Sequence, residues 1–311
     1  MTAPVAPAPS ARPPRRSHPT AAQLGFSERP SRSTRRRRTT SAVMSTLTLL
    51  AVVVSALPLL FILGYLIREG ASALSPSFFT RTPAPVGESG GGMANAIAGT
   101  LILIGLASLI GLPVGIGAGL YLAEHAGGRL ASAVRFLADV LNGLPSIVLG
   151  IFAWQFLVRP VGHFSALAGG VALGVMLIPM VTRATEEMVR LVPTSLREAA
   201  LALGYPRWRA SMAIVLRTAL AGIVTGALVG VARVAGETAP LLFTAFGNQF
   251  WSTSLREPIA ALPLQIFNYA ISPYDEWHAQ AWAGSIVLIA LVLLLSLLAR
   301  LGVRSRLAGR E

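Results

Sequence analysis

Two ionisable residues four positions apart interrupt a long apolar stretch of the sequence. The segment Ala232–Leu242 reads ARVAGETAPLL and contains Arg233 and Glu237. Fifteen uncharged residues separate Arg217 from Arg233, which is about 22 Å of helix. A bilayer's hydrocarbon core is about 30 Å thick. If this segment crosses a membrane, Arg233 still lies inside the core, at a cost of roughly 2.5–3.5 kcal/mol.

Two interpretations of this pair stay open on the residues alone. If the helix continues to Glu237, the two side chains share a face and an ion pair recovers part of the cost. That pair then serves only to fix helix packing. Alternatively, Arg233 is a polar point on the path of an anion, because a guanidinium offers charge and forked donors that suit phosphate oxygens. Thr238 would add a hydroxyl to such a path.

The composition predicts a membrane protein and excludes several chemistries. Of 311 residues, 53% are hydrophobic and 13% charged, with a mean hydropathy of +0.64, whereas a soluble domain carries about 25% charged residues. All 26 basic residues are Arg, so a P-loop lysine and a Schiff base are excluded. There is no Cys, which excludes disulfides and thiol nucleophiles. The four His stand apart, so no metal site is predicted.

Six apolar stretches are long enough to span a bilayer, which needs about 20 residues each. They are Val43–Ile67, Ala94–Leu122, Ala131–Val158, Phe164–Val181, Ala213–Val234 and Trp282–Leu301. The second and third contain Gly and Pro, which predicts breaks that only a packed bundle tolerates. Asn142, Pro145 and Ser146 lie near the break in the third. Either Asn142 or Ser146 hydrogen-bonds the backbone carbonyls that a kink leaves free, or these residues line a pore.

The distribution of arginine predicts the orientation. With the N-terminus inside, 21 of the 26 arginines fall on cytoplasmic segments. We therefore expect a multi-pass protein of the plasma membrane with both termini cytoplasmic. Residues 1–42 are rich in Pro, Ser, Thr and Arg and are predicted to be a disordered tail, leaving 43–311 as the membrane domain. The run Arg35–Arg38 orients the first span and contacts anionic lipid rather than nucleic acid.

The segment 182–217 is too polar to cross the membrane and has a helical composition. Ser195 and Glu198 fit a capping box, with Ser195 as N-cap. Gly204 suits the left-handed end of a helix, and Pro206 suits the first turn of the next. We expect a helix, a sharp turn and a second helix at the inner membrane surface.

The same segment carries a recognisable spacing. Glu198, Ala199 and Ala200 are followed after three residues by Gly204, and nine residues later by Ile214-x-Leu216. This resembles the EAA motif of binding-protein-dependent ABC importer permeases, with Arg217 where that family usually has Pro. The resemblance implies that a coupling loop at about 184–212 fits a cleft on a separate ATPase subunit.

Three further runs extend the resemblance over roughly residues 94–250. GLPVGIGAGLYLAEHAG (111–127), NGLPSIVLGIFAW (142–154) and VARVAGETAPLLFTA (231–245) are similar to permeases of the phosphate ABC importer, the last to the PstA kind. The resemblance implies an all-α integral membrane protein: six transmembrane helices in a type I (MetI-like) bundle with a cytoplasmic coupling helix.

The resemblance also implies which residues serve the substrate. It places Arg233 and Glu237 on the phosphate path, and Arg183 with them through a matching "IP…R" segment. On the residues alone, Arg183 is an inside anchor whose stem snorkels. Glu186, Glu187 and Arg190 are predicted to form i,i+3 and i,i+4 pairs on a cytoplasmic helix face.

The implied protein is a transport subunit without catalytic residues or cofactors of its own, ATP and Mg belonging to a partner ATPase. Its implied partners are a second, PstC-like permease, a PstB-like ATPase dimer, a PstS-like extracytoplasmic phosphate-binding protein and membrane lipid. A sulfate or molybdate permease is the alternative, because an Arg-lined path does not separate these dianions from phosphate. A membrane enzyme would need convergent acids or metal ligands, and a secondary transporter inverted repeats, and the sequence shows neither.

Overall fold

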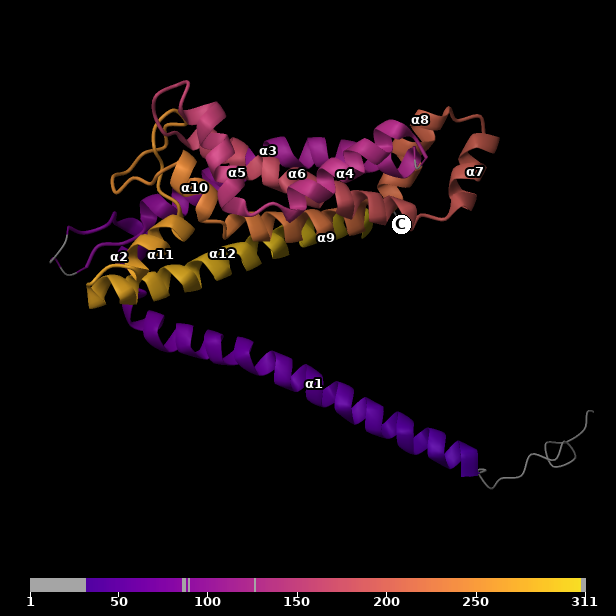
Figure 1. Cartoon of the computed structure of the whole chain (residues 1–311), viewed down its shortest axis with the longest axis horizontal. Helices are drawn as coiled ribbons and strands as arrows, with labels where there is room; N and C mark the ends of the chain where they lie inside the picture. The colour runs from indigo at the N-terminus through magenta and orange to yellow at the C-terminus, as the bar shows by residue number, and fades with distance from the viewer. Residues whose placement is uncertain (1–31, 86–87, 89, 126, 309–311) are drawn as a thin grey trace, which may run out of the picture. The chain divides into compact units, whose positions relative to one another are not determined.

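A computed structural model describes residues 32–85, 88, 90–125 and 127–308, most of them in helices (Figure 1). The helices are α1 (Arg32–Gly70), α2 (Pro76–Thr80), α3 (Ala94–Glu124), α4 (Arg129–Gly143), α5 (Ser146–Ala153), α6 (Ala166–Arg190), α7 (Thr194–Ala202), α8 (Arg207–Ala210), α9 (Leu216–Ala235), α10 (Ala239–Thr244), α11 (Leu262–Ala270) and α12 (Asp275–Ala308). The chain divides into two compact units, residues 1–62 and 63–311, and each is described by itself.

Within the first unit the structure describes one helix, the N-terminal part of α1. The helix begins at Arg32, so residues 32–42 are helical where the sequence predicted a disordered tail. The physical reason is that helix propagates easily from a long apolar segment into Arg, Ser and Thr residues. Residues 1–31 of the predicted tail lie outside the described residues. Residues 43–62 of α1 are mostly apolar, as expected of a helix in lipid.

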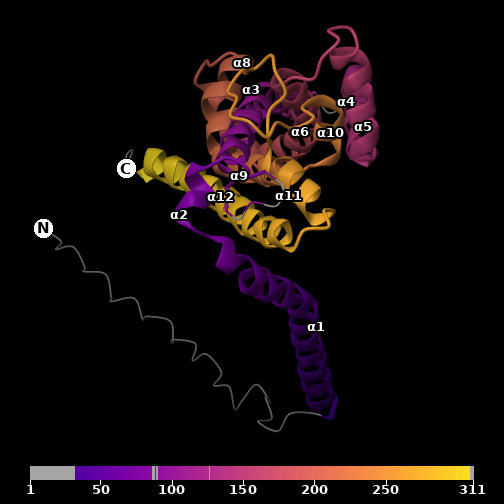
Figure 2. The ribbon, with the colours of Figure 1, turned by 90° about the vertical axis from the view of Figure 1, so that its left-hand side faces the viewer.

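Small residues bring α3 against α6, and the two helices run side by side through the second unit (Figures 1 and 2). Gly111, Gly115 and Gly119 recur every four residues along one face of α3. A Cβ added at any of the three would stand 2.5–2.8 Å from an atom of α6. Glycine therefore permits an approach that no larger residue allows. In consequence α6 is the most buried of the apolar helices in the described part of the chain.

The two predicted breaks have different outcomes. α3 is one continuous helix through Pro113, so the break expected there is wrong. The third predicted span does break, because α4 and α5 meet at 104°. Leu144 between them is extended, with φ −72° and ψ 137°, as a residue before proline prefers. Past α5 the chain continues as a π-helical turn, Trp154–Val158.

The other predicted spans are confirmed as helices, with ends that differ from prediction. Phe164–Val181 lies mostly in α6, which runs on to Arg190, and Trp282–Leu301 lies in α12, which begins at Asp275. α8 leads into α9 through the π-helical turn Ser211–Val215, without a break before Arg217. By length and composition, five described helices are able to cross a membrane, and the bent α4–α5 pair makes a sixth if it counts as one span.

Candidate functional site

A pocket of about 290 Å³ lies where the bent span, α6 and the end of α9 meet. The bend contributes residues 141–146 and Leu149, and α6 contributes Met176 and Met180. Arg233 and Glu237 complete the lining. The pair that stood out in the sequence therefore faces a cavity shared by three segments distant in the chain.

The ion pair inside this pocket is loose. Nε of Arg233 is 3.9 Å from Oε1 of Glu237, and the side chains are 63% and 18% exposed. α9 ends at Ala235, with Gly236 as its C-cap, so Glu237 stands just beyond the helix rather than on it. A pair this open contributes at most about 1 kcal/mol to stability. So weak a pair does little to fix the packing of α9, and the Arg233 side chain is left largely exposed.

Polar groups of the bend face the same cavity. Asn142 and Ser146 line it, and Ser146 begins α5. The amide N–H groups in a helix's first turn are unpaired within the helix and give it a partly positive end. A cation, an amide, a hydroxyl and the first residue of a helix thus line one cavity, and these are groups that oxyanion sites in proteins use.

Thr238 does not join this set. Its hydroxyl donates to the carbonyl oxygen of Pro263 at 3.4 Å, and it is not part of the pocket lining. The structure therefore places Thr238 at a contact between the start of α10 and the start of α11. Its predicted place on a substrate path gains no support from the geometry.

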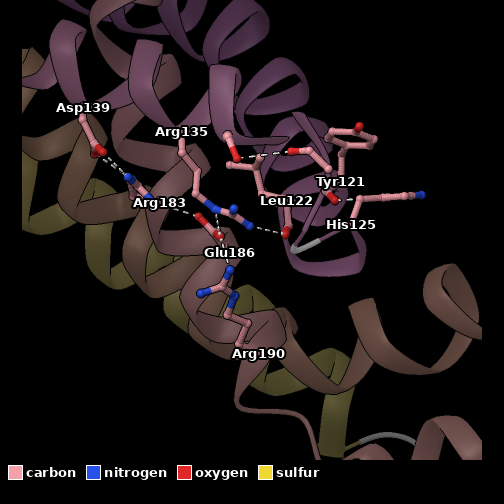
Figure 3. A network of polar contacts seen from close by, with 10 residues as sticks. Tyr121, Leu122, His125, Arg135, Asp139, Arg183, Glu186 and Arg190 are labelled. Carbon is pink, nitrogen blue, oxygen red and sulfur yellow. Dashed lines mark hydrogen bonds and ion pairs between the residues drawn. The ribbon is translucent and has the colours of Figure 1, made fainter. Parts of the chain in front are cut away.

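Arg183 lies in a second polar cluster, nearer the α7 end of α6 (Figure 3). Its Nε donates to Oδ1 of Asp139 at 2.9 Å, and its Nη2 pairs with Oδ2 of the same carboxylate. Its Nη1 donates to Oε2 of Glu186 at 3.0 Å. Arg183 is therefore not part of the pocket lining, and it is engaged by two carboxylates.

Glu186 is the centre of this cluster. Its Oε1 also lies 2.7 Å from Nε of Arg135 and 2.6 Å from Nη2 of Arg190, while its side chain is only 3% exposed. Arg135 further donates to the carbonyl oxygen of Leu122 at 2.8 Å, which links α3, α4 and α6 (Figure 3). Of the pairs predicted among Glu186, Glu187 and Arg190, the i,i+4 pair Glu186–Arg190 is present, while the i,i+3 contact of Glu186 is with Arg183. The tertiary partner Arg135, 51 residues away, allows the carboxylate to be buried.

The predicted helix–turn–helix is present as α7, a turn and α8. The predicted capping box is wrong: α7 begins at Thr194 after Pro193, and no side chain caps it. Gly204 has φ +83°, and its N–H donates to the carbonyl of Leu201 at 2.9 Å. The N–H of Tyr205 donates to the carbonyl oxygen of Ala200 at 3.1 Å. These bonds form a Schellman motif, so the prediction for Gly204 is confirmed.

The segment α7–α8 presents an exposed surface. Glu198, Ala199 and Gly204 are exposed, whereas Ala200 is buried. Leu203 and Trp208 are large apolar side chains that also stand largely exposed. Such a surface is typical of a contact with another subunit.

Asp139 and Arg135 are the site residues that sequence reasoning missed. Both lie on α4, and Asp139 precedes Asn142 of the bend by three residues. The Asp139–Arg183 contact spans 44 residues of sequence. The available signal was an acidic residue in an otherwise apolar segment, which predicts a partner without naming it.

Comparisons with known proteins agree with one another. Residues 115–306 match the family described as "Binding-protein-dependent transport system inner membrane component". A relative from Yersinia pestis, named phosphate transport system permease protein PstA, is 51% identical over 245 residues, or 78% of this chain and 82% of the relative. One of the same name from Haemophilus influenzae is 46% identical, over 85% of this chain and 94% of the relative.

A solved structure supports the fold. An inward-facing MetNI methionine ABC transporter chain aligns with 68% of this chain and 92% of its own length, with a TM-score of 0.53 and 23% identity. At that identity the likeness concerns the fold alone.

Proposed function

The chain belongs to the binding-protein-dependent transport permeases, among the phosphate permeases of the PstA kind, and we propose that it carries inorganic phosphate past Arg233. It is the membrane-spanning permease subunit of an ABC-type phosphate importer, a multi-pass membrane protein and not an enzyme. The relatives' name favours phosphate over sulfate or molybdate.

One observation carries the proposed path. Arg233 faces the pocket with a mostly exposed guanidinium, and its nearest carboxylate stands 3.9 Å away. A phosphate dianion needs a cation and hydrogen-bond donors, and Arg233, Asn142 and Ser146 supply both. Glu237 neutralises Arg233 when the pocket is empty, so that phosphate is bound weakly enough to leave. Thr238 is left off the proposed path, because its hydroxyl contacts Pro263 and it does not line the pocket.

The chain works within a transporter complex. We assign to it a second, PstC-like permease that completes the path, a PstB-like ATPase dimer, and a PstS-like extracytoplasmic phosphate-binding protein. ATP and Mg belong to the ATPase, since this chain has no P-loop lysine. With both termini cytoplasmic, as the arginine distribution predicts, α7 and α8 lie on the ATPase side.

The proposed mechanism is alternating access. The exposed segment Glu198–Gly204 sits in a cleft of the ATPase, and closure of the ATPase dimer moves it. Arg197 passes the motion on, because its Nη2 lies 2.9 Å from Oε1 of Glu124 at the end of α3. Since α3 packs tightly on α6, the motion reaches the pocket wall at Met176 and Met180.

Competition in uptake tests the substrate. Cells lacking this chain are complemented with it, and uptake of labelled phosphate is measured with excess unlabelled phosphate, sulfate or molybdate. The proposal expects restored uptake that only unlabelled phosphate suppresses. Suppression by sulfate or molybdate at equal strength, or no restored phosphate uptake, would show that the substrate is another oxyanion.

A further inference from the structure

Arg183 contacts Asp139 in the same geometry in which a guanidinium binds an oxyanion. The Nε and Nη2 atoms of Arg183 face the two oxygens of one carboxylate (Figure 3). This two-atom fork is how a guanidinium binds two oxygens of a phosphate. Asp139 therefore occupies the edge of Arg183 that an anion would take.

The two carboxylates at Arg183 differ in how firmly they are held. Glu186 is 3% exposed and contacts three arginines. Asp139 is 59% exposed, although its partner Arg183 is only 29% exposed. Asp139 is held through Arg183 alone, whereas Glu186 is held by three arginines, so Asp139 can leave the fork while Glu186 keeps Arg183 in place.

The fork lies next to the pocket, on the side of α7. Met176 and Met180 line the pocket, and Arg183 follows Met180 by three residues, which puts it on the same face of α6. From Met176 to Arg183 the rise is about 10 Å. Asp139 likewise precedes Asn142 by one turn of α4. An anion that leaves the pocket along these faces meets the fork next.

Resting on the proposed function, we propose that Asp139 is an internal counterion that competes with phosphate for Arg183 and so speeds release toward the ATPase side. The cluster holds three arginines and two carboxylates, Asp139 and Glu186. Phosphate leaving Arg233 displaces Asp139 from the fork and binds Arg183. When Asp139 returns to Arg183 it displaces the phosphate. Arg183 therefore binds phosphate only transiently during release and is not a second high-affinity site.

Removal of the Asp139 charge tests this exchange. Labelled phosphate binding is measured for each variant of the complete transporter in nanodiscs without nucleotide, and turnover is measured separately as ATP-driven uptake by proteoliposomes. Asp139→Asn should lower the dissociation constant of phosphate about tenfold, the effect of one charge-assisted contact, and lower turnover. Asp139→Glu should stay near wild type. Glu187→Gln, an exposed carboxylate on α6, is the matched control.

The outcomes separate exchange from a structural role. A purely structural Asp139 would make Asp139→Asn bind phosphate more weakly or no differently from Glu187→Gln, and either result overturns the proposal. If Asp139→Asn does not assemble, Arg183→Lys decides, since it keeps the charge without the fork. It should weaken phosphate binding about tenfold, and unchanged binding overturns the proposal. Wild-type phosphate uptake reports on the proposed function independently of these variants.

Discussion

Replacement of the buried carboxylate Glu186 by Gln should destabilise the protein far more than the same change next to it. Oε1 and Oε2 of Glu186 accept from Arg135, Arg183 and Arg190 at 2.6–3.0 Å. Loss of one partner of a buried ion pair costs about 3–5 kcal/mol. Because the arginines are partly exposed and a Gln oxygen still accepts a hydrogen bond, we expect about 3 kcal/mol, at the low end of that range.

The assay is thermal unfolding of the purified transporter. A loss of about 3 kcal/mol lowers the midpoint by roughly 6–12 °C for a chain of this order of size. Glu187→Gln alters an exposed carboxylate and should stay within about 0.5 kcal/mol of wild type. Equal midpoints for the two variants would refute the reasoning, since they would show that the Glu186 contacts add nothing to stability.

Three further predictions concern packing, the turn and the path. Gly115→Leu should prevent assembly of the permease, because even a Cβ at this position stands 2.7 Å from Val181 of α6; membrane fractions probed for the chain will show its loss. Gly204→Ala should destabilise the α7–α8 turn by about 1 kcal/mol, because φ of Gly204 is +83°. The loss of stability will appear as faster protease cleavage at the turn, and an unchanged cleavage rate would contradict the prediction. Thr238→Val should leave the phosphate KM within about twofold of wild type, because the hydroxyl's 3.4 Å bond to Pro263 is too long to contribute much; a large rise in KM would restore Thr238 to the path.

The helices were predictable because hydrophobic length is a local property of the sequence. Five predicted spans correspond to helices whose ends differ by up to eleven residues, and Gly204 ends α7 as its type predicts. Pro113 and Pro145 show the limit of such reasoning. Both follow a Gly-Leu pair, yet α3 continues through Pro113 while the chain turns by 104° at Pro145. Packing of α3 against α6 favours the continuous helix, and that packing is not visible locally.

The candidate site was predictable in its charges and not in its contacts. Arg233 and Glu237 stood out because charge is rare in an apolar segment. The pocket around them needs Asn142 and Ser146 from a bend some 90 residues earlier. The partner of Arg183, Asp139, was missed for the same reason. Residues that meet only through tertiary structure give no signal in spacing.

The measurement that tests the central claim most directly is phosphate uptake by the purified, reconstituted transporter with Arg233→Gln. The loose Arg233–Glu237 pair predicts that this variant assembles and unfolds within about 1 kcal/mol of wild type, yet transports no phosphate. Arg81→Gln, an exposed arginine outside the pocket, should transport normally. Normal uptake by Arg233→Gln, or loss of uptake that only follows loss of assembly, would contradict the assignment of Arg233 to the phosphate path.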